Sequence, residues 1–355
     1  MRLLRSPFLF GTLLVPPAFV ACLAVPPRAV YEIEHGTVRA DDPQEARAVA
    51  DLLAVLRPRL LACLPDARED HVEVWLQDEP RLYRFPHEAG SDAEGLYAPS
   101  QGRILLSRGL EDMERVLAHE LVHATLGPSW SRLPGTLEEG LCDALAARVS
   151  GQGVERLRAG RLSSAALACG GLQLVVTVRT TGPDGTRRGW AARVSLSSDE
   201  RVEDPGRDVF QVEAGLSSTK LEPNVKRGLY GLSFLLVDRV VERVGVEGLH
   251  RLCLEAEREG RSKVSRQALL GAAELDGDVG AWRTAAAASM RPGDLADLAR
   301  MYPGIVADVV LSRGRVGPGD LEGLEIEIGC AQGEERARIH EVPEVRAAIQ
   351  ERLGL

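Results

Sequence analysis

The amino-acid sequence predicts an α+β fold, with a small mixed sheet in the first third of the chain and a mostly helical second half. Short stretches before residue 110 alternate between apolar and polar residues, as strands with one buried face do. After residue 226, apolar residues recur at intervals of three and four, which is the spacing of helices with one buried face. The 355 residues, 45% of them hydrophobic and 27% charged, suit a globular protein of one large or two modest domains.

Residues 1–25 are expected to be an export signal rather than part of the fold. Two arginines precede an apolar run, which is the order found in secretory leaders. The segment Phe19–Cys22 is similar to a bacterial lipobox, which implies cleavage before Cys22 and a lipid on its thiol. Ordinary cleavage near Ala24 is the alternative. Both predict an exported protein, either a periplasmic or outer-membrane lipoprotein attached to the membrane through Cys22, or a secreted protein.

Charge and cysteine content exclude some functions. The net charge is −9 and no basic run occurs, so nucleic acid is not expected as a partner. Apart from Cys22, five cysteines remain, so at least one is free unless it pairs between chains.

The strands and helices of the predicted N-terminal half, residues 26–150, can be placed in order. A helix is expected over Glu45–Leu64, with a kink or break at Pro58. The stretches His71–Leu76 and Leu96–Ser107 are expected to be strands, the second folded at a turn over Pro99–Gly102.

The next helix carries the residues with the clearest chemistry. His119 and His123 lie four apart, so both imidazoles can reach one zinc ion, with Glu120 close beside them. Gly127, as a left-handed cap, and Pro128 are expected to end this helix. The alternative is a surface helix that carries two histidines by chance.

A third ligand is expected from a second helix soon after. Thr136 is its predicted N-cap, and Glu139 is either a capping-box partner or a metal ligand. Asp143 lies four residues beyond Glu139, on the same face, where it can hydrogen-bond a ligating histidine. Glu138 is the rival ligand, but it is out of phase with Asp143. Cys142 is interpreted as a small buried apolar residue. Three leucines on a neighbouring face are expected to pack into the core: Leu137, Leu141 and Leu145.

These two helices resemble those of the gluzincin metallopeptidases, the thermolysin-like branch of the zincin fold, and more closely the bacterial peptidase MA-like group. The resemblance rests on HELVHA followed by LPGTLEEGLCD. It implies Zn²⁺ as cofactor, with His119, His123 and Glu139 as ligands, Glu120 as general base and Asp143 as the residue that orients a ligand. Two positions depart from the group, with threonine at 136 where tryptophan is usual and cysteine at 142 where alanine is usual.

The resemblance also implies a substrate-binding edge and an oxyanion donor. The strand Arg103–Ser107 would form the rim of the cleft, where an extended peptide can pair. Tyr230 begins a segment similar to the group's Y–x–x–S and would face the zinc, donating a hydrogen bond to the oxyanion. The alternatives are a core tyrosine, or His250 as the donor.

The remaining chain divides into three predicted segments. Residues 151–225 are interpreted as an insert with a hairpin of Leu172–Thr180 and Trp190–Leu196, which either flanks the cleft or is mere decoration. Residues 226–290 form a helical half, and residues 291–355 a small extension. Their expected helices are Tyr230–Val244 ended by Gly245, Glu247–Glu259, Ser265–Glu274, Val279–Met290, Asp294–Met301 and Glu344–Leu353, with a strand at Leu324–Ile328.

The sequence therefore predicts an exported zinc metallopeptidase that acts on peptide or protein substrates. Two alternatives remain: a zinc hydrolase of a non-peptide substrate, such as an ester or a cell-wall amide, and a catalytically silent lipoprotein scaffold. The presence of Glu120 argues against the scaffold, because a non-catalytic site needs no base.

Overall fold

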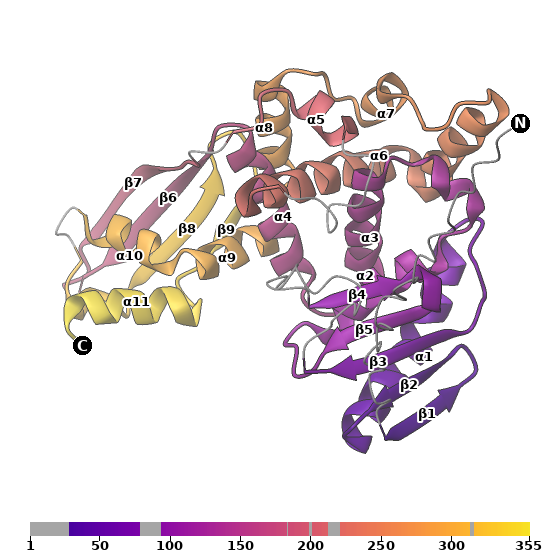
Figure 1. Ribbon diagram of the computed structural model, residues 1–355. Coiled ribbons are helices and arrows are strands. Elements are labelled where there is room, and N and C mark those ends of the chain that lie inside the picture. Colours follow the sequence, from indigo (N-terminus) through magenta and orange to yellow (C-terminus); the bar gives the residue numbers. More distant parts are fainter. Residues whose placement is uncertain (1–27, 79–93, 183, 199–200, 212–220, 313–315) are drawn as a thin grey trace, which may run out of the picture.

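The computed structural model describes residues 28–78, 94–182, 184–198, 201–211, 221–312 and 316–355. The predicted leader and Cys22 lie outside these residues. Within them, the predicted fold class is confirmed. A small mixed sheet comes early in the chain, and helices dominate the second half (Figure 1).

The first sheet has five strands in the order β1-β2-β3-β5-β4. Its strands are β1 (Ala29–Ile33), β2 (Gly36–Ala40), β3 (Val72–Gln77), β4 (Gly95–Ala98) and β5 (Arg103–Ser107). β2, β3 and β5 run parallel, whereas β1 and β4 are antiparallel to their neighbours. The prediction that Arg103–Ser107 forms the edge is wrong. The short turn after Ala98 folds β4 back along the outer side of β5, so β4 is the edge strand.

Helix α1 (Pro43–Cys63) packs against β1 and β2 and buries Leu53, Leu56 and Leu60. It continues through Pro58, so the expected break is absent. Pro58 and Ala54 both lie on the exposed face of the helix. Pro58 has no N–H to donate to the Ala54 carbonyl oxygen, and because this oxygen is on the exposed face it can be hydrated instead.

Helix α2 (Met113–Thr125) packs against β4 and β5 and contacts α1. Gly127 does not have the predicted left-handed conformation, since its φ is −79°. A glycine is needed there for a different reason. A Cβ atom at this position would lie 1.8 Å from the backbone oxygen of Asp66.

Helix α3 (Gly135–Val149) begins two residues earlier than predicted, with Pro134 as its N-cap. Thr136 is therefore buried inside the first turn and is not the cap. The predicted core leucines Leu137, Leu141 and Leu145 are fully buried.

Helix α6 (Pro223–Arg258) contacts both α3 and α4 (Val154–Ala168), a helix that the sequence did not predict. Glycines allow the backbones to touch. A Cβ atom at Gly140 of α3 would lie 2.4 Å from the Ser233 carbonyl oxygen, and one at Gly231 of α6 would lie 2.4 Å from that of Arg161. The predicted interruption at Gly245 is confirmed by a φ of 76°.

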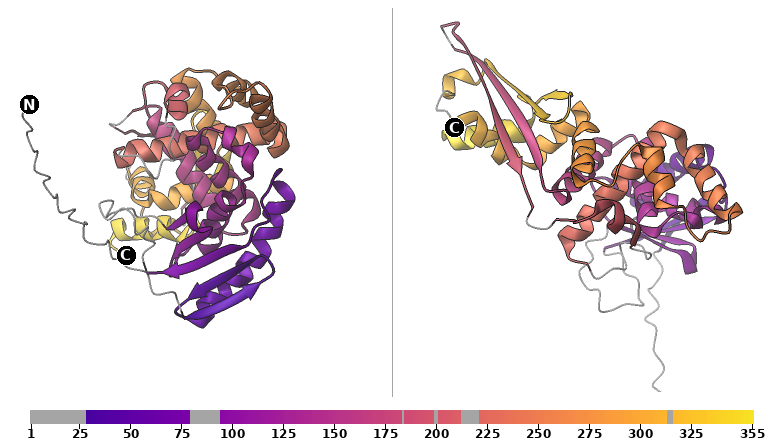
Figure 2. Two further views of the ribbon diagram at one scale, coloured as in Figure 1. Left: turned by 45° about the vertical axis from the view of Figure 1, so that its right-hand side comes forward. Right: turned by 90° about the horizontal axis from the view of Figure 1, so that it is seen from above.

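The second sheet belongs to a C-terminal lobe. It contains β6 (Leu172–Thr181), β7 (Arg187–Leu196), β8 (Leu324–Cys330) and β9 (Arg336–Arg338) in the order β7-β6-β8-β9. The predicted hairpin is present as β6 and β7 and projects from this lobe (Figure 2). β6 pairs with β8, so the presumed insert and the C-terminal extension share one sheet.

Helices complete the C-terminal lobe and join it to the rest. α9 (Pro292–Met301), α10 (Pro303–Leu311) and α11 (Pro343–Leu353) pack beside the second sheet (Figure 1). α5 (Pro205–Gln211) and α7 (Arg266–Ala273) pack on α6, while α8 (Val279–Ala288) packs on α4. α10 was not predicted.

Among the described residues, no helix combines the length and apolarity needed to cross a bilayer. The described cysteines form no disulfide: Cys63, Cys142, Cys169, Cys253 and Cys330.

Candidate metal centre

Helices α2 and α3 bring a buried group of potential metal ligands together. His119 and His123 lie on successive turns of α2, and their ring centroids are 5.2 Å apart. Cys142 of α3 lies close to both, with ligand atoms of all three residues within 4.8 Å of one another. Glu139 lies between the two rings. Its Oε2 atom is 3.4 Å from His119 Nε2 and 3.5 Å from His123 Nε2.

The other nitrogen of each imidazole is held by a separate carboxylate. His119 Nδ1 donates to Asp143 Oδ1 at 2.9 Å, and His123 Nδ1 donates to Glu138 Oε1 at 2.9 Å. A proton on Nδ1 leaves the lone pair of a neutral ring on Nε2, beside Glu139. Asp143 therefore occupies the position expected of it. Glu138 has an orienting contact that the sequence reasoning missed.

The phase of Glu138 relative to Asp143 argues against Glu138 as a metal ligand, but it does not exclude Glu138 as a hydrogen-bond acceptor for a histidine. Each ligating histidine usually has its own hydrogen-bond acceptor, and this signal was available in the sequence. The short helix α3 offers one carboxylate for each ring, Asp143 for His119 and Glu138 for His123.

A further residue, Arg161 of α4, supports this arrangement. Its Nε atom donates to Asp143 Oδ2 at 2.5 Å, and its guanidinium carbon lies 4.8 Å from the centroid of the Tyr230 ring. Arg161 thus links the carboxylate behind His119 to Tyr230. No local sequence pattern reveals this contact, because it depends on the packing of α4 on α6.

Charges around the site oppose the effects of burial. Burial disfavours a charged His119, but Asp143, Glu139 and Glu120 outweigh it and raise the pKa of His119 to about 9. Cys142, Glu138 and Glu139 likewise outweigh burial and raise the pKa of His123 well above its usual value. Against its own burial, Glu139 has its pKa held far below the normal range by hydrogen bonds to the two histidines.

Glu120 lies beside this group on α2 but hydrogen-bonds to neither ring. It is 7% exposed, and burial raises the pKa of its carboxyl group. The backbone of Tyr97 partly offsets this rise. A Cβ atom at Gly95 would lie 2.9 Å from Glu120 Cγ, so the glycine lets strand β4 approach the carboxylate.

The group opens into a cavity of about 560 Å³. One wall is the edge strand β4, through Gly95, Leu96 and Tyr97. The opposite side is formed by α3, Arg161 and Tyr230. The structure thus brings together every residue predicted for the metal site and for catalysis: His119, Glu120, His123, Glu139, Asp143 and Tyr230.

Tyr230 and His250, the two candidates for the oxyanion donor, lie in different surroundings. Tyr230 lines the cavity, and burial and Glu139 raise the pKa of its hydroxyl, so the proton is retained. His250 does not line it. Its Nε2 atom lies 2.7 Å from Ser129 Oγ, and its ring packs against Trp130 with centroids 5.1 Å apart.

Comparison of the chain with protein-family models, curated proteins and solved structures gives no match. Function is therefore inferred from the geometry and chemistry of this site alone.

Proposed function

We propose that this protein is an exported, gluzincin-like zinc metallopeptidase. In this proposal His119, His123 and Glu139 bind the zinc, and Glu120 is the general base. One observation carries it: a single carboxylate oxygen of Glu139 lies beside Nε2 of both histidines, while both Nδ1 atoms are bound by other carboxylates.

The donor set fits zinc in distance and chemistry. Zinc in tetrahedral sites binds imidazole nitrogen and carboxylate oxygen at about 2.0–2.2 Å, which places neighbouring ligand atoms about 3.3–3.5 Å apart. The distances of 3.4 and 3.5 Å from Glu139 match this separation. Two histidines and one glutamate would also leave a fourth position open, as catalytic zinc sites do.

Cys142 is the alternative third ligand, and we favour Glu139. Glu139 is already ionised, because its pKa is held low. Burial raises the pKa of the Cys142 thiol to about 12, so this thiol would have to lose its proton before it could bind a metal.

The side chains around the metal have separate tasks. When bound, zinc would supply Lewis acidity, polarising the scissile carbonyl and lowering the pKa of a water molecule toward about 7. Glu120 would take a proton from the attacking water and return it to the leaving amine. Its raised pKa suits both transfers. Tyr230 keeps its proton and would donate a hydrogen bond to the developing oxyanion.

The edge strand supports a peptide as the substrate. Among the described strands β4 pairs only with β5, so none of them occupies its outer side. Three of its residues line the cavity next to Glu120. An extended peptide that added to this edge would pass directly over the metal ligands.

Metal content and cleavage test this proposal together. Purified protein should contain about one zinc, as a site with three protein ligands and an open position requires. It should cleave casein or a peptide panel before chelation and not after it. His119→Ala should lose the metal. Glu120→Gln should keep the metal while turnover falls by about 10²–10⁴-fold, the usual contribution of a general base.

Matched variants distinguish catalysis from folding. Glu114→Gln changes the same helix outside the cavity, where Glu114 accepts a hydrogen bond from the Gly151 amide, and should remain active. Tyr230→Phe should lower turnover by about 10²–10³-fold if its hydroxyl meets the oxyanion. Wild-type turnover in Glu120→Gln would refute the mechanism. A zinc protein that cleaves esters or cell-wall amides but no peptide would establish the alternative hydrolase.

A further inference from the structure

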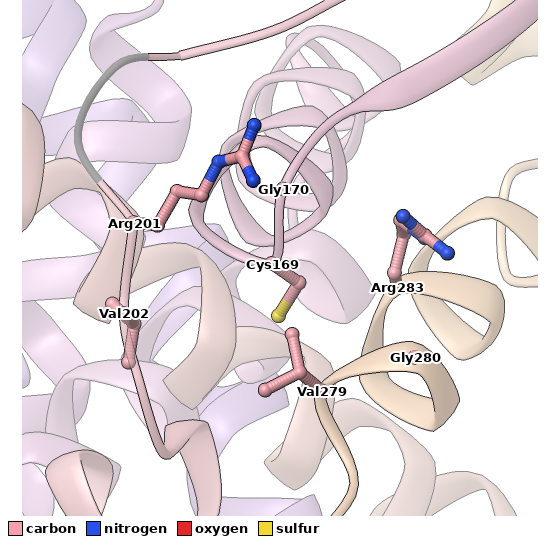
Figure 3. Close-up of a pocket in the computed structure, with 7 residues that line it drawn as sticks. All are labelled: Cys169, Gly170, Arg201, Val202, Val279, Gly280 and Arg283. Carbon is pink, nitrogen blue, oxygen red and sulfur yellow. The ribbon is translucent and has the colours of Figure 1, made fainter.

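A second cavity lies away from the metal centre, where α4 ends, β6 begins and α8 starts (Figure 3). It has a volume of about 300 Å³ and shares no lining residue with the first cavity. The residues that matter here are Cys169, Gly170, Arg201, Val279, Gly280 and Arg283.

Two arginines from distant parts of the chain meet at this cavity. Arg201 precedes α5, and Arg283 belongs to α8. A Cβ atom at Gly170 would lie 4.0 Å from the NH1 atom of Arg201 and 3.9 Å from that of Arg283. Figure 3 shows the two guanidinium groups on either side of this glycine. Because Gly170 has a φ of +100° and no side chain, the space between the arginines stays open.

Neither arginine has an ion-pair or hydrogen-bond partner among the described residues, and Arg283 Nε is buried without an acceptor. Three arginines of α4 behave differently. Arg156, Arg158 and Arg161 each contact a carboxylate within 3 Å. Arg201 is exposed and Arg283 is partly buried, and among the described residues no carboxylate pairs with either guanidinium group. A bound anion would supply the counter-charge.

The start of α8 adds further donors. Val279 and Gly280 are its first two residues, and their amides have no partner in the described structure because the Asp278 side chain caps Ala281 instead. Free amides at a helix N-terminus favour a negative ligand, although the Asp278 carboxylate opposes it nearby. Cys169 also lines this cavity. Burial raises the pKa of its thiol to about 12, so this residue adds no negative charge.

We propose that this cavity binds a small tetrahedral oxyanion, either free phosphate or the phosphate group of a small ester, through Arg201 and Arg283. Guanidinium groups bind such oxygens with two parallel hydrogen bonds. Two of them on different sides suit a tetrahedral group better than a planar carboxylate. The volume of about 300 Å³ leaves room for an organic substituent.

Calorimetric titration of the purified protein with sodium phosphate, against sodium chloride at equal ionic strength, tests this site. Zinc is removed by chelation and dialysis first, so that phosphate cannot bind at the metal. Saturable binding is expected. Arg201→Gln and Arg283→Gln should each weaken it about 10–100-fold, the loss expected for a charge-assisted hydrogen bond. Arg193→Gln removes an exposed arginine of β7 and should leave binding unchanged.

Phenyl phosphate in a parallel titration distinguishes the two sources of the anion. Binding as tight as that of phosphate, with the same dependence on both arginines, identifies a phosphate ester as the ligand. Binding of inorganic phosphate alone identifies the free ion. Absence of saturable binding in the folded wild-type protein, or wild-type affinity in both arginine variants, would overturn the proposal. The titration needs neither zinc nor turnover, so its result is independent of the proposed peptidase activity.

Discussion

Each imidazole of the candidate metal centre lies between two carboxylates. Nδ1 of His119 faces Asp143, Nδ1 of His123 faces Glu138, and both Nε2 atoms face Glu139. A carboxylate on Nδ1 fixes the tautomer, orients the ring and makes Nε2 a better electron donor. Glu138 and Asp143 should therefore both strengthen metal binding without touching the metal.

Substitution of these two carboxylates measures their contributions. Asp143→Asn and Glu138→Gln should each weaken zinc binding about 10–100-fold, the usual effect of a residue that orients a ligand. Asp143 should have the larger effect, because its side chain is 1% exposed whereas that of Glu138 is 37% exposed. Competition with a chelating dye gives the affinities. Glu335→Gln, an exposed carboxylate far along the chain, is the control. Unchanged affinity in Glu138→Gln would show that its hydrogen bond to His123 does not contribute to zinc binding.

Residue spacing predicted most of this centre. The interval of four places His119 and His123 on one face of their helix, and Glu139 and Asp143 on one face of theirs. That these two faces meet was implied by the resemblance and not by the spacing. Arg161 could not be predicted in this way. Its contact with Asp143 requires α4 to lie against α6, which depends on the shape of Gly231 and not on any local pattern.

The protonation of the histidines predicts how zinc affinity depends on pH. Without metal, the pKa of His119 is raised to about 9 and that of His123 well above 6.5, so both rings are charged at neutral pH. Zinc requires a free Nε2 on each, so binding should release about two protons near neutrality. Affinity should therefore rise with pH until His119 has lost its proton, and fall by up to about 100-fold per unit as pH decreases.

Calorimetry in two buffers of different ionisation enthalpy counts the released protons. The control is Glu114→Gln, which changes α2 outside the cavity and should release the same number of protons as the wild type. Zinc affinity that is constant between about pH 6 and 8 would contradict this account of the site.

At the scale of the elements, strand β4 lies close against helix α2 at Gly95. A Cβ atom there would lie 2.8 Å from Val116 Cγ1, 2.9 Å from Glu120 Cγ and 3.0 Å from Glu120 Oε1. The backbone of the neighbouring Tyr97 also lowers the pKa of this carboxyl group, against the larger effect of burial. The edge strand therefore sets the position of the proposed general base.

Gly95→Ala should move Glu120, the strand or both. Turnover should fall by at least about 10-fold, because small displacements of a reacting group cost one to two orders of magnitude. Overpacking should cost about 1–3 kcal/mol of stability. Zinc content should not change, since no metal ligand contacts this position. The control is Gly271→Ala in α7, where a Cβ atom would have no neighbour within 4 Å. Full activity in Gly95→Ala would show that the strand does not position the base.

The sequence predicted the elements well where local residues determine the conformation. The hairpin of β6 and β7 followed from alternation around a Gly-Pro-Asp-Gly turn, and the interruption of α6 from Gly245. The predictions were wrong where a contact with a residue distant in the sequence determines the conformation or the strand order. Gly127 is present because Asp66 approaches it, and β5 is interior because β4 folds back over it.

At the scale of the whole molecule, the C-terminal lobe is assembled from segments far apart in the sequence. β6 begins at Leu172 and pairs with β8, which begins at Leu324. Neither strand contains a signal that specifies its partner, so the separate segments predicted from the sequence could not be joined. A buried ion cluster lies where this lobe meets the helices of the metal centre.

Arg158 of α4 is the centre of this cluster. It donates to Asp238 of α6 at 2.7 Å, to Asp294 of α9 at 3.2 Å and to the carbonyl oxygen of Ser289 after α8 at 3.0 Å. All three charged side chains are at most 5% exposed. Burial raises the pKa of Asp294, which shows how poorly its charge is solvated.

Arg158→Met should therefore destabilise the molecule by about 3–5 kcal/mol, because it removes the cation from buried Asp294 and leaves buried Asp238 with only the more distant Arg148, at 3.8 Å. By calorimetry, the melting temperature should fall by about 5 °C or more. The same helix offers a matched control in Arg156, whose ion pair with Glu111 has the same length of 2.7 Å but side chains that are 56% and 81% exposed. Arg156→Met should cost no more than about 1 kcal/mol, as exposed pairs do.

Adding Asp238→Asn and Asp294→Asn to Arg158→Met should recover part of the lost stability, because the unpaired charges are then removed. Equal melting temperatures for Arg158→Met and Arg156→Met would show that this cluster does not hold the two lobes together.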